Sequence, residues 1–204
     1  MIDYSNEAKA AATKAERIYK VARIAFFEAI DIRACIEALE ASNQPEVLRS
    51  LNNARAAHAA DLIQKALFGR LLITVMTAFD PVKRGDFHLK VGMDLIGEEI
   101  PRMAVLQRGG KLDDIQAAER RWAECLNFEP RDRLRTYRNK SVAHLSDPPD
   151  GMEDPIISEL FALARMTAEV AEHLAHGTGF AAVSLESQMI PFRESSRAFW
   201  GKWT

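Results

Sequence analysis

The chain has 204 residues, of which 48% are hydrophobic and 27% are charged, and its formal net charge is −2. This length allows one domain with a proper core, and this composition excludes a disordered chain. The slightly negative charge excludes a uniformly basic coat for nucleic acid, so any RNA-binding surface has to be a local patch.

Helical periodicity dominates the first part of the chain. Apolar residues recur at helical spacing between Ile18 and Leu39, which predicts one long helix. A loop at 42–45 ends it, and Pro45 suits the first turn of a second long helix, which we expect to run to Phe79. Two long helices joined by a short loop should pack antiparallel.

The middle and the end of the chain are predicted to hold shorter helices. Several glycines interrupt residues 83–110, which we interpret as a connection with one short helix at best. A helix is predicted over 112–126, and Pro130 opens the next one. A further helix is expected from about residue 155 to 176, closed by Gly177.

The predicted fold class is therefore all-α, an antiparallel helix bundle with two long N-terminal helices. We divide the chain into a helical domain, residues 1–177, and a C-terminal aromatic tail, residues 178–204. The tail carries phenylalanines and tryptophans with arginines, so we expect it to pack on the domain or on a partner subunit. The alternative is an aromatic and basic surface that stacks RNA bases.

The cysteines and the apolar runs predict a cytoplasmic protein. Cys35 and Cys125 each lie in an apolar helical pattern, which is typical of buried reduced thiols rather than of a disulfide framework. The longest apolar run, residues 71–79, is too short to span a bilayer. The N-terminus lacks a secretory signal pattern, so we expect the protein to be neither exported nor inserted in a membrane.

One segment carries candidate chemistry, Tyr137-Arg138-Asn139-Lys140-Ser141-Val142-Ala143-His144. A histidine exchanges protons near neutral pH, an arginine stabilises phosphate oxygens, and an amide can hydrogen-bond the substrate. These groups can cleave RNA without a metal ion or another cofactor. The candidate catalytic residues are Arg138, His144 and Asn139.

The same segment is the most basic part of the chain. From Glu129 to His144, five residues are basic and two are acidic. Arg131, Arg135 and Arg138 follow one helix face, which fits either a stripe that tracks phosphates or a merely solvated face. The candidate RNA-binding residues are Arg131, Arg135, Lys140 and Tyr137, although a tyrosine at this spacing is more often part of a core.

The arginine, asparagine and histidine pattern late in an all-α chain resembles the HEPN superfamily. The second predicted helix, Asp61 to Thr74 with Phe79-Asp80 after it, is similar to the AbiU-type HEPN branch associated with phage abortive infection. The resemblance extends from about Ile18 to His176 and leaves the tail outside it.

The resemblance implies a metal-independent endoribonuclease that acts as a toxin or antiphage effector. Its active cleft would form between two protomers of a homodimer, each contributing Arg138 and His144. RNA is the expected partner, an antitoxin protein is a possible one, and no membrane is expected. Control by modification of a tyrosine two residues after the histidine is doubtful, because Ser146 stands there.

Other interpretations of these residues remain open. Arg138 could be a surface arginine paired with Asp132 or another carboxylate, and the fold could be a non-catalytic HEPN-like module that binds a nucleotide, RNA or a protein. At about 100° per residue, His144 lies roughly 120° from Arg138 around an α-helix, which favours a site shared between protomers. Three residues on one face of the last long helix, Glu169, His173 and His176, could hold a metal, but a helix-end role is the simpler account.

Overall fold

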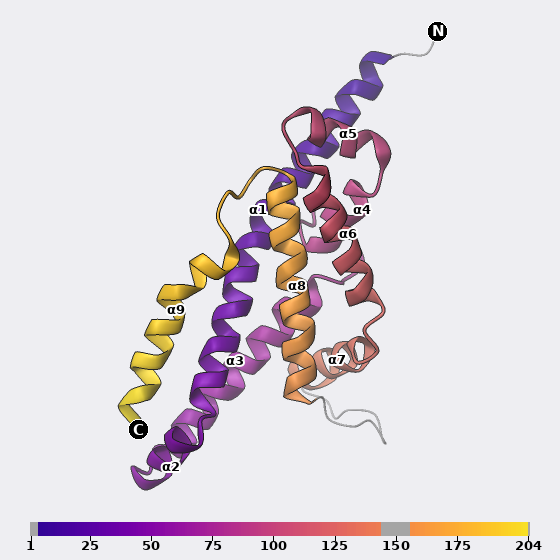
Figure 1. Cartoon of the computed structure of the whole chain (residues 1–204). Coiled ribbons are helices and arrows are strands. Elements are labelled where there is room, and N and C mark those ends of the chain that lie inside the picture. Colours follow the sequence, from indigo (N-terminus) through magenta and orange to yellow (C-terminus); the bar gives the residue numbers. More distant parts are fainter. Residues whose placement is uncertain (1–3, 144–155, 204) are drawn as a thin grey trace.

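A computed structural model describes residues 4–143 and 156–203 of the chain. These residues form helices and turns and contain no β-strand, which confirms the predicted all-α class. The elements, in chain order (Figure 1), are α1 (Tyr4–Ser42), α2 (Pro45–Asn53), α3 (Ala57–Thr77), α4 (Leu89–Ile96), α5 (Glu99–Gln107), α6 (Leu112–Leu126), α7 (Arg131–Tyr137), a π-helical turn (Arg138–Ala143), α8 (Ile157–Gly177), α9 (Leu185–Trp200) and a 3₁₀ turn (Gly201–Trp203).

The long helix α1 is the axis of the bundle. α8 and α9 lie along it, α3 and α4 pack on it as well, and α6 covers α8 (Figure 1). The apolar stripe of α1 is buried, with Ile18, Ile36 and Leu39 almost fully covered. Each such side chain contributes about 1.5–3 kcal/mol of hydrophobic stabilisation, so α1 holds the other helices together chiefly by its apolar face.

α1 and α3 are antiparallel, as the short connection predicts. Gln64, near the start of α3, donates a hydrogen bond of 3.0 Å to the hydroxyl of Ser42 at the end of α1. Farther along α3, Arg70 pairs with Asp31 at 2.7 Å. The two contacts run in opposite directions along the two helices, so the antiparallel packing is confirmed.

The second long helix of the prediction is two helices in the structure. α2 ends at Asn53, and Arg55 adopts a left-handed conformation with φ of 57°. The amide of Arg55 donates to Asn52 O at 3.1 Å and that of Ala56 donates to Leu51 O at 2.8 Å, the two bonds of a Schellman motif. Glycine usually occupies the left-handed position, and here an arginine does, so the sequence carries no signal for this break.

The interpretation of residues 83–110 as a connection was wrong, because they contain α4 and α5. Gly92 is one of the glycines that predict an interruption here, but it lies inside α4. A methyl group there would come within 2.7 Å of Cγ1 of Val21 and 3.1 Å of Cδ2 of Leu174. This glycine therefore permits a close approach of α4 to α1 and α8 rather than a turn.

The later helices follow the predictions closely. α6 spans Leu112–Leu126, the predicted range, and α8 ends at Gly177. Both bury one apolar face against the other. Cys125 of α6 is fully buried, and burial raises the pKa of its thiol to about 12.

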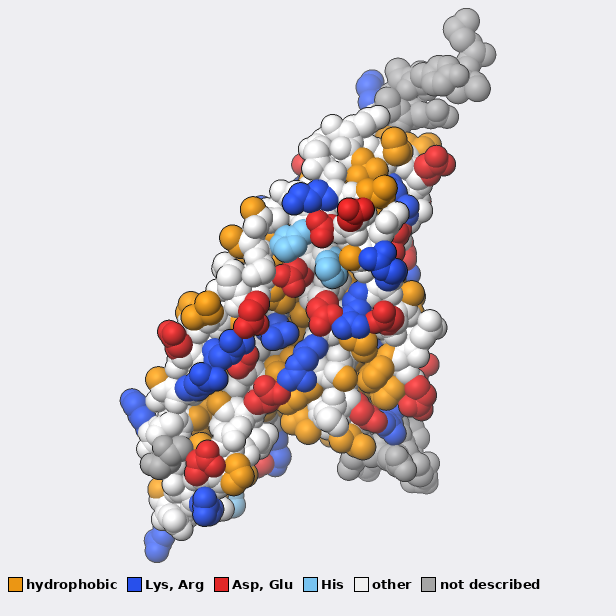
Figure 2. Space-filling view, viewed as in Figure 1, with side chains coloured by type: hydrophobic (Ala, Val, Ile, Leu, Met, Phe, Trp, Pro, Cys, Tyr) orange, Lys and Arg blue, Asp and Glu red, His pale blue; other side chains and the backbone are white. Residues whose placement is uncertain are grey.

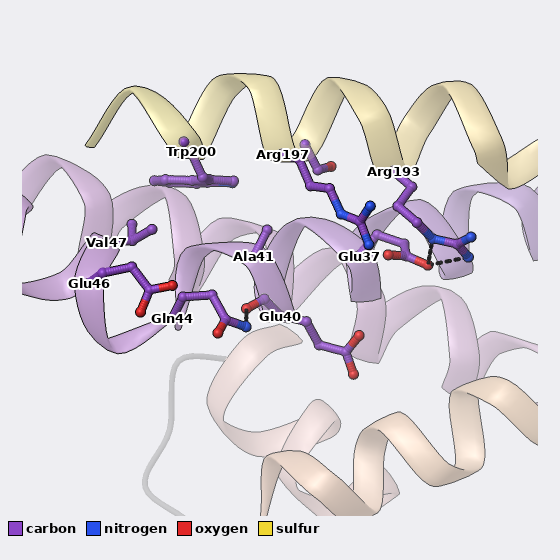
Figure 3. A pocket seen from close by; sticks show the side chains of 11 residues that line it. Glu37, Glu40, Ala41, Gln44, Glu46, Val47, Arg193, Arg197 and Trp200 are labelled. Carbon is purple, nitrogen blue, oxygen red and sulfur yellow. Dashed lines mark hydrogen bonds and ion pairs between the residues drawn. The ribbon is translucent and has the colours of Figure 1, made fainter. Parts of the chain in front are cut away.

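The tail forms α9, which packs along α1 and closes over α2. Trp200 is 4% exposed and contacts an apolar cluster with Val47, Leu51 and Ala60. Figure 3 shows the Trp200 ring above Val47. Farther along α9, Arg193 contacts Glu37 of α1, and its Nη2 lies 2.9 Å from Glu37 Oε1. Other aromatic side chains of α9, such as Phe192 and Phe199, are exposed.

The visible surface carries mixed charge. In Figure 2, basic and acidic side chains alternate over α8 and α9, and the described part of this face shows no broad patch of one sign. No helix in the described ranges combines the length and the apolar character that crossing a membrane requires.

Candidate functional site

The candidate site is built around Phe79, in the turn that follows α3. The Phe79 ring stacks on Trp122 of α6, with centroids 4.9 Å apart and an interplanar angle of 3°. The guanidinium of Arg131, at the start of α7, also lies over the Phe79 ring, 5.9 Å from the ring centroid. α7 itself is anchored by Leu134, which is fully buried. The ends of α3 and α6 thereby fix the position of α7.

Arg138 is fixed by the residue that follows Phe79. Its Nη2 lies 2.6 Å from Asp80 Oδ1 and its Nη1 lies 3.2 Å from Asp80 Oδ2, a bidentate ion pair. The side chain of Arg138 is 14% exposed and that of Asp80 is 31% exposed. Two parallel hydrogen bonds fix the plane of the guanidinium as well as its position. The structure thus gives Arg138 a carboxylate partner, which is Asp80 and not Asp132.

Two of the arginines of α7, Arg131 and Arg135, are held mainly by backbone oxygens. Arg135 donates to Phe79 O at 3.1 Å, and Arg131 approaches Cys125 O at 3.5 Å. Asp132 lies farther from both, at 3.6 Å from Arg131 and 3.8 Å from Arg135. Carbonyl oxygens do not cancel a positive charge, so this cluster of three arginines keeps a surplus over Asp80 and Asp132.

The arginines also retain unused donors. The Nε atoms of Arg131, Arg135 and Arg138 are buried and have no hydrogen-bond partner among the described residues. Arg131 is 17% exposed and Arg135 is 36% exposed. The helix face that carries Arg131, Arg135 and Arg138 is therefore not a merely solvated face. The stripe is half-buried and held by the bundle.

Arg138 begins a π-helical turn, Arg138–Ala143. In such a turn each hydrogen bond spans five residues instead of four, and these turns are frequent at functional sites. The rotation of about 100° per residue therefore does not apply from Arg138 onward. The argument that put His144 roughly 120° from Arg138 assumed α-helical geometry, and the structure removes that assumption.

The other candidate residues lie at the edge of the same region. Asn139 and Lys140 are exposed on the first part of the π turn. Tyr137 is half-buried and packs on the core, with its ring 6.4 Å from that of Phe68 in an edge-to-face contact. His144 and Ser146 lie outside the described residues, so the approach of His144 to Arg138 stays a prediction.

The possible metal ligands of the last long helix have other contacts. Glu169 pairs with Arg121, Nδ1 of His173 lies 4.0 Å from Asp114, and Nε2 of His176 lies 3.0 Å from Val183 O. No cluster of three metal-ligating side chains occurs in the part of the chain that the structure describes.

Two contributors to the site were not identified from the sequence. Asp80 was named only as part of the Phe79-Asp80 pair after the second predicted helix, and nothing in the pattern links it to Arg138, 58 residues later. Glu159 of α8, which pairs with Arg133 of α7, was not singled out either. The only available signal for Asp80 was a carboxylate at the end of an apolar helix, directly after an aromatic residue.

A comparison with protein families supports the resemblance seen in the sequence. A HEPN family model described as AbiU2 matches residues 12–199. The match includes most of α9, so the expected extent, which ended at His176, was too short. No curated protein and no solved structure gives a match.

Proposed function

The chain belongs to the AbiU2 family of HEPN proteins, and from this premise we propose that it is a metal-independent endoribonuclease that acts as a toxin or antiphage effector. One observation carries the proposal. Arg138 is fixed by Asp80 at the first residue of a π turn that leads toward His144. A fixed cation beside a proton-exchanging side chain is what cleavage by the ribose 2'-hydroxyl needs.

The reaction needs no external nucleophile. His144 would accept the proton of the 2'-hydroxyl while that oxygen forms a bond to its own phosphorus. The bond from phosphorus to the 5'-oxygen breaks, and a second His144, from the partner protomer, would protonate the leaving oxygen. The products are a 2',3'-cyclic phosphate and a free 5'-hydroxyl, and the numbers of atoms and protons balance.

Arg138 would stabilise the extra charge on the phosphorane-like transition state. A guanidinium has five N–H donors, and the bidentate pair with Asp80 uses two of them. The Nε–H is buried, so one N–H on each Nη remains for a phosphate while Asp80 prevents rotation of the group. Preorganised donors of this kind contribute much of the rate enhancement in phosphate and acyl transfer.

Nearby arginines would hold the RNA strand. Arg131 and Arg135 lie on the same side of α7 and are anchored by carbonyl oxygens, so their charge remains available to the backbone phosphates. Asn139 and Lys140 are exposed where the strand would pass. The net charge of −2 is compatible with this proposal, because only a local patch is required.

The test is cleavage of a defined single-stranded RNA in excess EDTA. We expect the unmodified protein to leave 2',3'-cyclic phosphate ends and to spare the same strand with 2'-deoxyribose at the cleaved position. Arg138→Ala and His144→Ala should lose this activity. Matched controls are Arg165→Ala, whose arginine pairs with Glu40 on α1, and His58→Ala on an exposed part of α3. Cleavage that survives in both site variants would overturn the proposal.

A second candidate function is a non-catalytic HEPN module that binds RNA, a nucleotide or a protein. The Asp80–Arg138 pair favours it, because a carboxylate at 2.6 Å also lowers the attraction of Arg138 for a phosphate. Binding and cleavage separate the two functions. Loss of RNA binding in Arg138→Ala, together with no cleavage by the folded unmodified protein, would establish the binding module.

A further inference from the structure

An open groove with exposed aromatic side chains lies between α1 and α9. Its volume is about 860 Å³. Phe27 of α1 is 58% exposed, Phe180 is 37% exposed and Phe192 of α9 is 43% exposed. Side chains of this size rarely gather on a surface that stays in water. The groove therefore has the composition of an interface.

The aromatic side chains of the groove are ordered by one another. Phe27 and Phe180 make an edge-to-face contact with centroids 6.2 Å apart, and buried Phe26 contacts both rings. A preformed cluster loses little side-chain entropy when a partner covers it. Phe27 is its most exposed member and projects from the middle of α1.

Charged residues flank Phe27 symmetrically along the helix. Arg23 lies four residues before it and Asp31 four residues after it, and both line the groove. At 1.5 Å per residue, each lies about 6 Å along the axis from Phe27 and on nearly the same face. Arg23 is exposed and has no ion pair or hydrogen bond from its side chain within the described ranges. Asp31 contacts Arg70 through Oδ2.

We propose that this groove binds a second copy of the chain, with the two α1 helices antiparallel about a two-fold axis at Phe27. An isologous interface requires that each residue meet its complement in the other copy. With Phe27 on the axis, Arg23 of one copy faces Asp31 of the other, and the contact is repeated on the other side. One surface thus carries the two opposite charges that an antiparallel pairing with itself would bring together.

This interface is separate from the candidate site. The groove is lined by α1, α9 and Phe180, and no residue of α7 or of the π turn contributes to it. The inference therefore does not rest on the proposed function, and a ribonuclease or a binding module would pair in the same way. A cleft between protomers at Arg138 would be a second interface, and both together would build an assembly larger than a dimer.

Charge reversal tests the register of the two helices. Arg23→Asp alone puts two carboxylates opposite each other, and Asp31→Arg alone puts two guanidiniums opposite each other. An equal mixture of the two variants restores both attractive contacts in a heterodimer. We expect each single variant to raise the dissociation constant, measured by sedimentation of the full chain, about tenfold. The mixture should return to the unmodified value.

The control is Arg49→Asp, which reverses an exposed charge on α2 outside the groove and should leave association unchanged. Thermal melting checks that each variant is folded. Equal association of all variants and the unmodified chain would overturn the proposal, and so would a mixture that associates no better than its components. Either result would leave the groove to a different kind of partner.

A crosslink provides a readout specific to the two-fold axis. Phe27→Cys should form a disulfide between copies under mild oxidation, because the two substituted residues face each other. The native Cys35 and Cys125 are buried and do not compete. Leu62→Cys, at a site that is 70% exposed on α3, is the matched control. Equal crosslinking of both variants, or none in Phe27→Cys, would contradict the proposed arrangement.

Discussion

The arginine Arg193 of α9 and the arginines of α7 and the π turn have different kinds of partner. Along α9, Arg193 meets two carboxylates, Glu37 and Glu186, each at 2.9 Å. Along α7 and the π turn, Arg131 and Arg135 contact backbone oxygens, whereas Arg133 pairs with Glu159 and Arg138 pairs with Asp80. Arg193 is therefore neutralised, whereas the arginines of α7 and the π turn keep a surplus of positive charge.

The difference lies in the partners and not in the residue type. Glu37 and Glu186 hold the pKa of Arg193 above its usual range. The positive charge of Arg193 is therefore neutralised, and its pair with Glu37 attaches α9 to α1. The guanidinium of Arg131 lies over the Phe79 ring and Arg135 donates to Phe79 O, and these contacts position the two arginines without a neutralising carboxylate at hydrogen-bond distance. A cluster of arginines therefore indicates a site only when its acceptors are neutral or incomplete.

Replacement of Arg138 should produce the largest effect. Arg138→Ala is expected to lower the rate of RNA cleavage about a thousandfold, because the transition state loses its fixed cation. Arg138→Lys keeps the charge and loses the bidentate geometry, so we expect an intermediate loss. Single-turnover kinetics with the defined RNA measures both. If Arg138→Lys and the unmodified protein cleave equally fast, Asp80 does not position this group.

Trp200→Ala should give the next largest effect, on stability. The side chain is 4% exposed against α2 and α3, and its removal leaves a cavity that costs about 3 kcal/mol of unfolding free energy. Urea unfolding measures the loss. The control is Phe199→Ala, a neighbouring aromatic residue that is 54% exposed. Equal losses in the two variants would contradict the packing of the tail.

Asp80→Asn separates the positioning of Arg138 from its neutralisation. The amide keeps the shape and removes one charge of a partly buried pair, so we expect a loss of about 1–2 kcal/mol in stability. Cleavage should fall about tenfold, because Arg138 gains freedom to rotate. A faster enzyme would mean that Asp80 restrains the reaction, which is the opposite role.

An exposed ion pair should contribute much less. Arg165 on α8 pairs with Glu40 on α1, and the two side chains are 40% and 45% exposed. Arg165→Met is expected to change the unfolding free energy by less than about 1 kcal/mol and to leave RNA cleavage intact. A cleavage defect in this variant would show that the arginines outside α7 also belong to the site.

The smallest effect should come from Glu28, in the groove between α1 and α9. Burial, with a smaller contribution from Asp31, raises the pKa of Glu28. A raised pKa in the folded state means that stability is lost as the pH rises from the unfolded pKa through the folded one. Glu28→Gln should therefore raise the melting temperature at pH 7 and leave it unchanged at pH 3. A lower melting temperature at pH 7 would contradict the cause assigned to the shift.

Helices with clear periodicity and ordinary ends were predictable. α6 has its predicted bounds, and α8 ends at the predicted glycine. The break after Asn53 was not predictable, because an arginine, Arg55, occupies the left-handed position where a glycine is usual. Gly92 led to the opposite error. It predicted a break in the chain, but it lies within α4 and permits the close packing of that helix.

The candidate site was predictable as a motif but not as an arrangement. The spacing of Arg138 and its neighbours marks a basic helix, and the half-buried position of Tyr137 fits the ordinary expectation for its type. The pair with Asp80 joins residues 58 positions apart, and no local pattern encodes such a contact. The π turn was not predicted from the sequence either.

The contact between α9 and α1 joins two segments that lie far apart in the sequence. Glu37 and Arg193 are 156 residues apart, so their contact cannot form until Arg193 has left the ribosome. During synthesis the face of α1 that α9 covers stays open, and a product truncated before residue 185 never closes it. Closure of this face therefore depends on the synthesis of α9.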